Sequence, residues 1–363
     1  MATELARRHA KAFFKTPRDS FFLLAARIDS EIPRLDDAEI AYRLKRLVAT
    51  IGDGHTGGPQ SYPADRRLSL RFERFEDGIA VTSAGATYAG LVGRRLVRIG
   101  GMPAAAAFDT LSQYDAADNE WGRRSRVPRY LSAATTLAAT GITRANAPIE
   151  MTFSSLGGAG NDTTVSLAWP ESSPVALRPG PASRALPFSW RYVAERRAIV
   201  IRYDQCAFER EFAAMTDTIL RFADSAHVSR VVVDVRANSG GSTEVAEPLI
   251  KGLAARRSAI PGSAIYVLMG RNTYSSAMMF AIDMRRRLHA MLAGEPTGGT
   301  PNGYGEVLRL VLPNSHLAFQ YSTKYFGLDK SGANTVSPDV PIAATIASFV
   351  ARRDVVLETV LAR

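Results

Sequence analysis

The sequence predicts a mixed α/β protein with a helical N-terminal segment, a small α+β module and a larger α/β domain. Two near-continuous apolar runs, Val231–Val235 and Ile265–Met269, are typical of strands that helices cover on both faces. Amphipathic helical patterns follow both runs, and this alternation indicates an α/β domain. Residues 67–100 instead show the period-two pattern of half-buried strands.

The composition is that of an ordinary globular protein. Of 363 residues, 46% are hydrophobic and 22% are charged, which excludes wholesale disorder, a collagen and a coiled coil. No apolar run approaches the roughly 18–20 residues of a membrane span, so none is expected. The single cysteine, Cys206, excludes an internal disulfide framework and a cysteine-based zinc site.

The net charge of +10 raises the question of nucleic-acid binding. The basic residues are mostly scattered arginines, and the longest run, Arg285–Arg287, falls in a helical pattern interleaved with Asp283. No aromatic and basic residues interleave as in RNA-binding proteins, so a nucleic-acid partner is not expected. The N-terminus Met1–Glu4 has no basic-then-apolar signal pattern, and the compartment stays open.

Residues 1–66 are expected to form the helical segment. Apolar residues recur there at helical spacing, and the acidic pair Asp36–Asp37 suits the positive start of a helix. The helical pattern ends at the glycine-rich loop Gly52–Gly58.

Residues 67–170 are expected to form the α+β module. Its expected strands enclose an alanine-rich helical stretch at 103–145 and lie at 68–72, 79–81, 91–99, 149–153 and 164–167. A proline-rich stretch follows, and residues 171–190 are therefore predicted to be a linker.

Residues 191–363 are expected to form the α/β domain. Its predicted strands lie at 198–201, 231–235, 265–269, 291–293, 306–312 and 316–322. Its predicted helices lie at 208–223, 244–255, 275–287 and 343–362.

Two strand-to-helix joints of this domain carry candidate chemistry, because α/β sites lie beyond the carboxyl ends of the strands. At the first joint, Gly240 and Gly241 follow a buried strand. Adjacent glycines let backbone amides face a ligand oxygen, although a glycine pair is also a common turn. At the second joint, Ser275 and Ser276 stand where a helix starts. A serine there is either an N-cap or a nucleophile favoured by the positive helix end.

A serine nucleophile needs a base, and His55 is the best candidate among the histidines. It lies in the glycine-rich loop beside Asp53, whose carboxylate is expected to cap amides of that loop. The other histidines lie in ordinary helix, turn or strand-edge contexts and are expected to be surface or filler residues: His9, His227, His289 and His316. No two histidines have the spacing of metal ligands, so no metal or other cofactor is expected.

Five motifs, in this order, resemble those of the C-terminal processing (tail-specific) serine peptidases. That family includes the tricorn core and the retinoid-binding repeats of the interphotoreceptor matrix. The motifs are Asp53–Thr56, Asp234–Gly241, Thr273–Ala277, Gly294–Gly299 and Val336–Val340. The resemblance implies a crotonase-like fold for the α/β domain. Residues 67–168 resemble the PDZ-like module of the family.

The resemblance implies that Ser275 is the nucleophile, because it precedes Phe280 as in the Ser-x-x-x-x-Phe pattern of the family. Ser276 would supply one oxyanion amide, and Gly240 or Gly241 would supply the other.

Many family members use a lysine base, but Thr300 stands at the corresponding position of this chain. The resemblance is therefore to the tricorn-like branch, in which a histidine from an earlier Asp-Gly-His loop is the base, here His55. That branch orients the histidine with a late acidic residue. The matching stretch of this chain lacks one, and Asn334 is the expected orienting residue.

The sequence therefore predicts a serine peptidase acting on a polypeptide, which the PDZ-like module would capture by strand addition. One alternative is a non-catalytic peptide- or ligand-binding protein on the same fold. Another is an acyl hydrolase that applies the same chemistry to non-peptide substrates. The joint presence of His55 and Ser275 favours an enzyme, because a binding protein has no need of both. The physiological substrate and the oligomeric state stay open.

Overall fold

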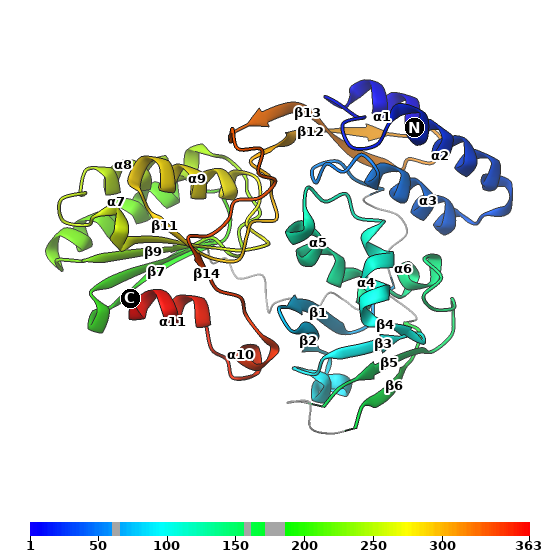
Figure 1. Cartoon of the computed structure of the whole chain (residues 1–363), viewed down its shortest axis with the longest axis horizontal. Coiled ribbons are helices and arrows are strands. Elements are labelled where there is room, and N and C mark those ends of the chain that lie inside the picture. Colours follow the sequence, from blue (N-terminus) through cyan, green and yellow to red (C-terminus); the bar gives the residue numbers. More distant parts are fainter. Residues whose placement is uncertain (60–65, 156–160, 171–185) are drawn as a thin grey trace. The chain divides into compact units, whose positions relative to one another are not determined.

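The computed structural model describes residues 1–59, 66–155, 161–170 and 186–363. The chain forms two compact units, whose elements are labelled in Figure 1. The first unit comprises Met1–Gly180, Gly303–Phe326 and Thr345–Val350. The second unit comprises Pro181–Asn302, Gly327–Ala344 and Ala351–Arg363. Residues 171–185 of the predicted linker lie outside the described residues.

The N-terminal helices of the first unit share a core with a hairpin that lies far along the chain (Figure 1). These elements are α1 (Ala2–Arg8), α2 (Arg18–Glu31), α3 (Asp37–Ala49), β12 (Asn302–Val311) and β13 (Ala318–Gly327). Phe21 and Leu47 from the helices and Phe319 from the hairpin are all fully buried in this core. The hairpin thereby packs against the helical segment, and its residue Ser322 contacts Asp53 in the loop that follows α3.

The start of α3 follows the sequence expectation. Asp36 accepts a hydrogen bond from the Glu39 amide at 2.8 Å, and Glu39 accepts one from the Asp36 amide at 3.0 Å. This reciprocal capping box satisfies two amides that have no partner inside the helix. The helix ends at Ala49, and Gly52 follows in the left-handed region at φ 74°.

The α+β module has its own core in the first unit. Its elements are β1 (Leu70–Phe75), β2 (Gly78–Ala84), β3 (Leu96–Ile99), β4 (Met102–Pro103), α4 (Ala104–Ser112), α5 (Glu120–Arg126), α6 (Ala134–Ala139), β5 (Ile149–Phe153) and β6 (Thr163–Leu167). β1 and β2 form an antiparallel pair, and the other strands form a sheet in the order β4-β3-β5-β6. The strand expected at 91–99 is shorter and spans only Leu96–Ile99, because Leu91 ends a 3₁₀ turn and Gly93 takes a left-handed conformation at φ 85°.

The second unit is built on a six-stranded sheet with the order β14-β11-β10-β9-β8-β7. The neighbouring strands are parallel except β7, which runs antiparallel to β8. The strands are β7 (Phe188–Val193), β8 (Ala198–Tyr203), β9 (Arg230–Asp234), β10 (Ile265–Met269), β11 (Met291–Gly294) and β14 (Val340–Pro341). The helices are α7 (Glu209–Ser225), α8 (Glu247–Ala254), α9 (Ser276–Leu288) and α11 (Val355–Ala362).

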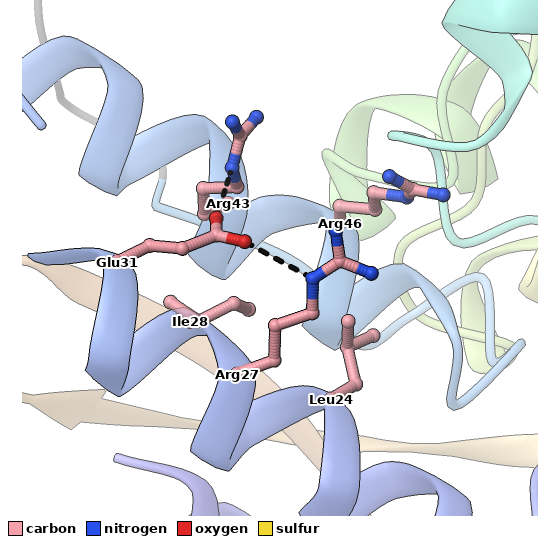
Figure 2. A pocket seen from close by; sticks show the side chains of 6 residues that line it. All are labelled: Leu24, Arg27, Ile28, Glu31, Arg43 and Arg46. Carbon is pink, nitrogen blue, oxygen red and sulfur yellow. Dashed lines mark hydrogen bonds and ion pairs between the residues drawn. The ribbon is translucent and has the colours of Figure 1, made fainter.

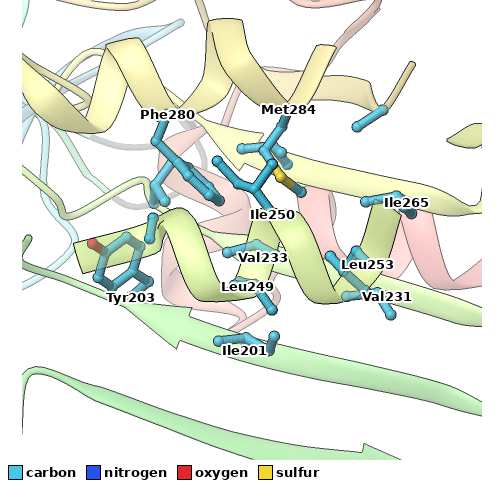
Figure 3. Packing of buried hydrophobic residues seen from close by; sticks show 14 of the residues in the cluster. Ile201, Tyr203, Val231, Val233, Leu249, Ile250, Leu253, Ile265, Phe280 and Met284 are labelled. Atoms are coloured by element: carbon cyan, nitrogen blue, oxygen red, sulfur yellow. The ribbon is translucent and has the colours of Figure 1, made fainter. Parts of the chain in front are cut away.

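Alternate residues of the central strands pack on opposite faces of this sheet. Val231 and Val233 join the core under α7, α8 and α9, as Figure 3 shows for part of that core. Val232 lies between them and packs with Val356 and Val360 of α11 on the other face. Both faces are therefore covered, which explains why β9 and β10 are apolar at nearly every position.

One element expected in the C-terminal part of the chain is wrong, and one strand was missed. The helix expected at 343–362 is broken into α10 (Ile346–Val350) and α11, because Arg352 between them takes a left-handed conformation at φ 53°. Asp354 then caps α11 by accepting the Leu357 amide at 3.1 Å. The strand β7 was not anticipated, because it begins at Phe188 directly after the proline-rich stretch.

None of the helices that the described residues form combines the length and the apolar character needed to cross a membrane.

Candidate active site

Four strands of the second unit end at one edge of the sheet, and the loops that follow them carry the candidate site. Because β8, β9, β10 and β11 are parallel, their carboxyl ends lie side by side. Gly240 and Gly241 follow β9, and Ser275 and Ser276 follow β10. The fold thus brings together two joints that are more than thirty residues apart in the sequence.

Ser275 has an unusual backbone conformation directly before α9. Its φ of 51° and ψ of −126° lie in a region that residues with a side chain rarely adopt. A strained serine between a strand and a helix is the geometry in which a nucleophile is held exposed above a sheet. Within the described chain, the Ser275 hydroxyl makes no capping hydrogen bond to α9. Ser275 is therefore not an ordinary N-cap serine.

Ser276 uses its hydroxyl differently. Its Oγ donates to the Gly241 carbonyl oxygen at 2.6 Å, and the side chain is buried. The amide of Ser276 is the first of α9, and the first amides of a helix have no partner inside it. The same residue thus ties the two joints together and presents an amide at the positive end of α9.

The two glycines leave no room for a side chain. Gly240 has φ 112°, and a Cβ on it would lie 2.8 Å from Ser275 Cβ and 3.2 Å from the Ser276 amide nitrogen. Gly241 has φ 136°, and a Cβ on it would overlap the carbonyl oxygen of Cys206. The glycine loop therefore lies directly against the serine joint, and only glycine fits at either position.

Asn238 is the buried residue that fixes this loop, and sequence analysis did not single it out. Its Oδ1 accepts the Gly240 amide at 2.9 Å, and its Nδ2 donates to the Tyr203 carbonyl at the end of β8 at 2.9 Å. Its backbone carbonyl accepts the Tyr274 amide at 3.1 Å. One asparagine thus connects three segments of the sheet edge. This role could not be predicted from the sequence, because an asparagine before Ser-Gly-Gly is typical of an ordinary turn.

Asn334 lies in the second unit, in the loop between β13 and β14, and its side chain is exposed. The next residues are tied to the loop after β11: the Thr335 hydroxyl donates to the Thr297 carbonyl at 2.8 Å. The Val336 amide donates to the buried Thr297 hydroxyl oxygen at 3.0 Å. The backbone beside Asn334 is therefore anchored to the sheet edge.

His55 belongs to the first unit, so its approach to Ser275 stays a prediction. Its backbone is held from both sides. The amide donates to Asp53 Oδ1 at 3.0 Å, and the carbonyl accepts from Gln320 Nε2 at 2.8 Å. The neighbouring Gly54 amide donates to Asp118 Oδ1 at 2.6 Å. The expectation that Asp53 caps amides of its own loop is confirmed.

The expectation that His9 is a surface or filler residue is wrong. Its side chain is fully buried, and its Nε2 lies 3.0 Å from Asp53 Oδ2. The same carboxylate oxygen accepts from the hydroxyls of Ser322 and Thr56. Burial raises the pKa of Asp53, but these hydrogen bonds and that of the His55 amide outweigh burial and hold the pKa below its usual value.

The described lysines of the second unit, Lys251 and Lys330, are both exposed and offer no buried base. Thr300, at the position where a lysine would stand, directs its hydroxyl to the Asn302 carbonyl at 3.4 Å. The Lys251 side chain is 72% exposed and pairs with Glu247 at 3.6 Å. A lysine base must be desolvated to be neutral near pH 7, and Lys251 is not.

A cavity of about 200 Å³ lies between α2 and α3, and it contains none of the predicted site residues (Figure 2). Its lining combines an aliphatic floor with a carboxylate between two guanidinium groups: Leu24, Arg27, Ile28, Glu31, Arg43 and Arg46. Arg27 and Arg43 each bond Glu31 at 3.0 Å, so part of the positive charge is compensated within the cavity.

No family model matches the chain, and no curated protein matches it either. Solved structures do match. Mature CPAF has 11% identity and a TM-score of 0.62, with 90% of this chain and 88% of that chain covered. CPAF complexed with lactacystin has 11% identity and a TM-score of 0.65, with 95% and 93% covered. A serine-to-alanine mutant of CPAF has 12% identity and a TM-score of 0.66, with 95% and 92% covered. The chain therefore has the mixed α/β fold of CPAF.

Proposed function

We propose that the protein is a serine peptidase in which Ser275 is the nucleophile and His55 the general base. The observation that carries this proposal is the conformation of Ser275. The backbone of Ser275 is strained at the start of α9, and the Ser275 hydroxyl does not cap that helix. Such strain costs about 1–3 kcal/mol and persists where the surrounding structure enforces it, most often at functional sites.

The proposed reaction is acyl transfer to the serine, followed by hydrolysis. Ser275 Oγ attacks the peptide carbonyl carbon, while its proton passes to His55. The C–N bond breaks when His55 returns that proton to the leaving amine, which leaves an acyl ester on Ser275. A water molecule, deprotonated by His55, then releases the acid and restores the serine.

The geometry favours Gly241 over Gly240 as the oxyanion donor that joins Ser276. The Gly240 amide is already bonded to Asn238 Oδ1 at 2.9 Å. Within the described residues, the Gly241 amide has no such acceptor, while the Gly241 carbonyl is held by Ser276 Oγ. Two amides fixed by these contacts would face the developing oxyanion without reorganising, which is the main source of rate in acyl transfer.

We further propose that Asn334 orients the His55 imidazole. Its backbone neighbourhood is anchored to Thr297, and an asparagine side chain carries both a donor and an acceptor. The absence of a carboxylate at this position makes this histidine less strongly polarised than one in an acid-containing triad.

The finer architecture is also a proposal. We propose that residues 191–363, apart from the stretches 303–326 and 345–350 that belong to the first unit, form a crotonase-like catalytic domain. We also propose that residues 67–170 are a PDZ-like module and that residues 1–66 carry the base. The four-stranded antiparallel sheet β4-β3-β5-β6 supports the second of these, since an open sheet edge can capture an extended peptide.

A fluorophosphonate probe tests the proposed function independently of the substrate. The probe modifies an activated serine, so wild-type protein is expected to label once per chain and Ser275→Ala not at all. Ser276→Ala is the matched control and keeps the label. A panel of peptide and ester substrates then separates a peptidase from a non-peptide acyl hydrolase. A wild-type protein that resists the probe and cleaves neither class overturns the proposal in favour of a binding protein.

A further inference from the structure

A buried polar cluster behind the His55 loop joins three segments of the first unit. His9 is the residue after α1, Asp53 and Thr56 belong to the His55 loop, and Ser322 lies on β13. The hydroxyls of Thr56 and Ser322 donate to the Asp53 carboxylate. His9 completes the set through its Nε2 at 3.0 Å.

The hydrogen bonds fix the tautomer of His9. Its Nδ1 accepts the Lys11 amide at 3.0 Å, so Nδ1 carries no proton. The proton of the neutral ring is therefore on Nε2, which donates to Asp53 Oδ2. The ring of Tyr304 packs against the imidazole at 5.3 Å between centroids and limits its rotation. His9 is thus a fixed donor aimed at one carboxylate oxygen.

The two oxygens of Asp53 have different tasks. Oδ2 receives the three side-chain donors, and Oδ1 receives the amide of His55 at 3.0 Å. The orientation that His9 imposes on Oδ2 therefore sets the position at which Oδ1 holds the His55 backbone. The loop needs such support, because Gly52, Gly54 and Gly57 give it little stiffness of its own.

We propose that His9 is a positioning residue for His55 and acts through Asp53. The part of this inference that concerns activity rests on the proposed function, whereas the part that concerns the loop does not. The residue after α1 thereby supports His55, 46 positions further along the sequence, with no direct contact to the reacting atoms.

Three variants of the full chain test the proposal. His9→Gln keeps a donor nitrogen near the Nε2 position, while His9→Asn places its amide near Nδ1, too short to reach Asp53. Glu4→Gln is the control, because Glu4 pairs with the exposed Arg7 and Arg8 on α1. The first readout is hydrogen exchange of the His55 amide. We expect His9→Asn to speed it about tenfold or more, and His9→Gln and Glu4→Gln to leave it within about threefold of wild type.

The second readout is the rate of fluorophosphonate labelling together with peptide turnover. We expect His9→Asn to lower kcat with little change in KM, and His9→Gln to restore it, as positioning of a base requires. Unchanged His55 exchange in His9→Asn, or equal effects of the Asn and Gln variants, overturns the proposal. If wild-type protein shows no activated serine, the proposed function fails, and the exchange data alone still decide the role of His9.

Discussion

The Ser276 hydroxyl donates to the Gly241 carbonyl oxygen at 2.6 Å and so joins the start of α9 to the glycine loop after β9. The bond explains why two adjacent serines at one joint have separate tasks. The Ser276 hydroxyl holds the loop through this bond. Ser275 lies beside the loop in a strained backbone conformation, and its hydroxyl does not cap α9. This contact and the strained conformation of Ser275 together support the proposed division into nucleophile and oxyanion support.

Ser276→Ala is expected to keep the covalent labelling of Ser275 but to slow it about fivefold. The substitution removes one hydrogen bond, of about 1 kcal/mol, that fixes the carbonyl of Gly241. The comparison of labelling rates for wild type, Ser276→Ala and Ser275→Ala measures this directly. Complete loss of labelling in Ser276→Ala, with labelling kept in Ser275→Ala, would show that the two roles are reversed.

Gly241→Ala is expected to abolish labelling and to destabilise the second unit. The new Cβ would overlap the Cys206 carbonyl oxygen, and φ 136° is unfavourable for any residue with a side chain. Chemical unfolding and probe labelling measure the two effects. Gly90→Ala is the control, because a Cβ there meets nothing within 4 Å and its backbone has no positive φ. Wild-type stability in Gly241→Ala would contradict the packing described for this loop.

Asn238→Ala is expected to lower the free energy of unfolding by about 1–3 kcal/mol, because it leaves the buried Gly240 amide and Tyr203 carbonyl without partners. The rate of fluorophosphonate labelling should also fall, since the same amide side chain positions the glycine loop. Urea unfolding of Asn238→Ala, with the exposed turn variant Asn314→Ala as the control, checks the magnitude. Equal stabilities of the two variants would mean that Asn238 does not fix the loop.

Asp53→Asn is expected to change how stability depends on pH. The pKa of Asp53 in the folded chain lies below its ordinary value of 3.8, so its ionised form stabilises the fold above that value. This contribution is lost as the pH falls through the lowered pKa. The wild type should therefore be more stable than Asp53→Asn at pH 7, and the difference should shrink as the pH falls below about 4.

Urea unfolding of both proteins across this acid range measures that difference. Asp162→Asn is the control, because Asp162 is exposed. A gap between wild type and Asp53→Asn that is constant with pH would contradict the hydrogen-bonded state of the carboxylate.

The central strands and helices of the second unit could be predicted from the sequence, because both faces of β9 and β10 are covered, so that β10 and the centre of β9 are apolar. The two glycines and two serines were also visible as candidates, since strand-to-helix joints have a recognisable pattern. The strand β7 and the break at Arg352 were missed. A hydrophobic pattern seldom reveals a short strand beside a proline-rich stretch. It also does not reveal a single left-handed residue.

The missed residues share a physical cause. His9 and Asn238 act through hydrogen bonds to partners that are distant in the chain, Asp53 and Tyr203. Periodicity reports which face of an element is buried, but it carries no information on which buried polar atoms meet. A histidine after a short helix and an asparagine before two glycines therefore looked ordinary until the fold placed their partners.

A crystal structure of the fluorophosphonate adduct tests the proposed Ser275–His55 pair directly. We expect a phosphonyl group on Ser275 Oγ, with its oxygen at the amides of Gly241 and Ser276. We also expect a His55 ring nitrogen within about 3–4 Å of Ser275 Oγ. A modification on any other residue, or a His55 side chain more than about 10 Å from Ser275 in the adduct, would contradict it.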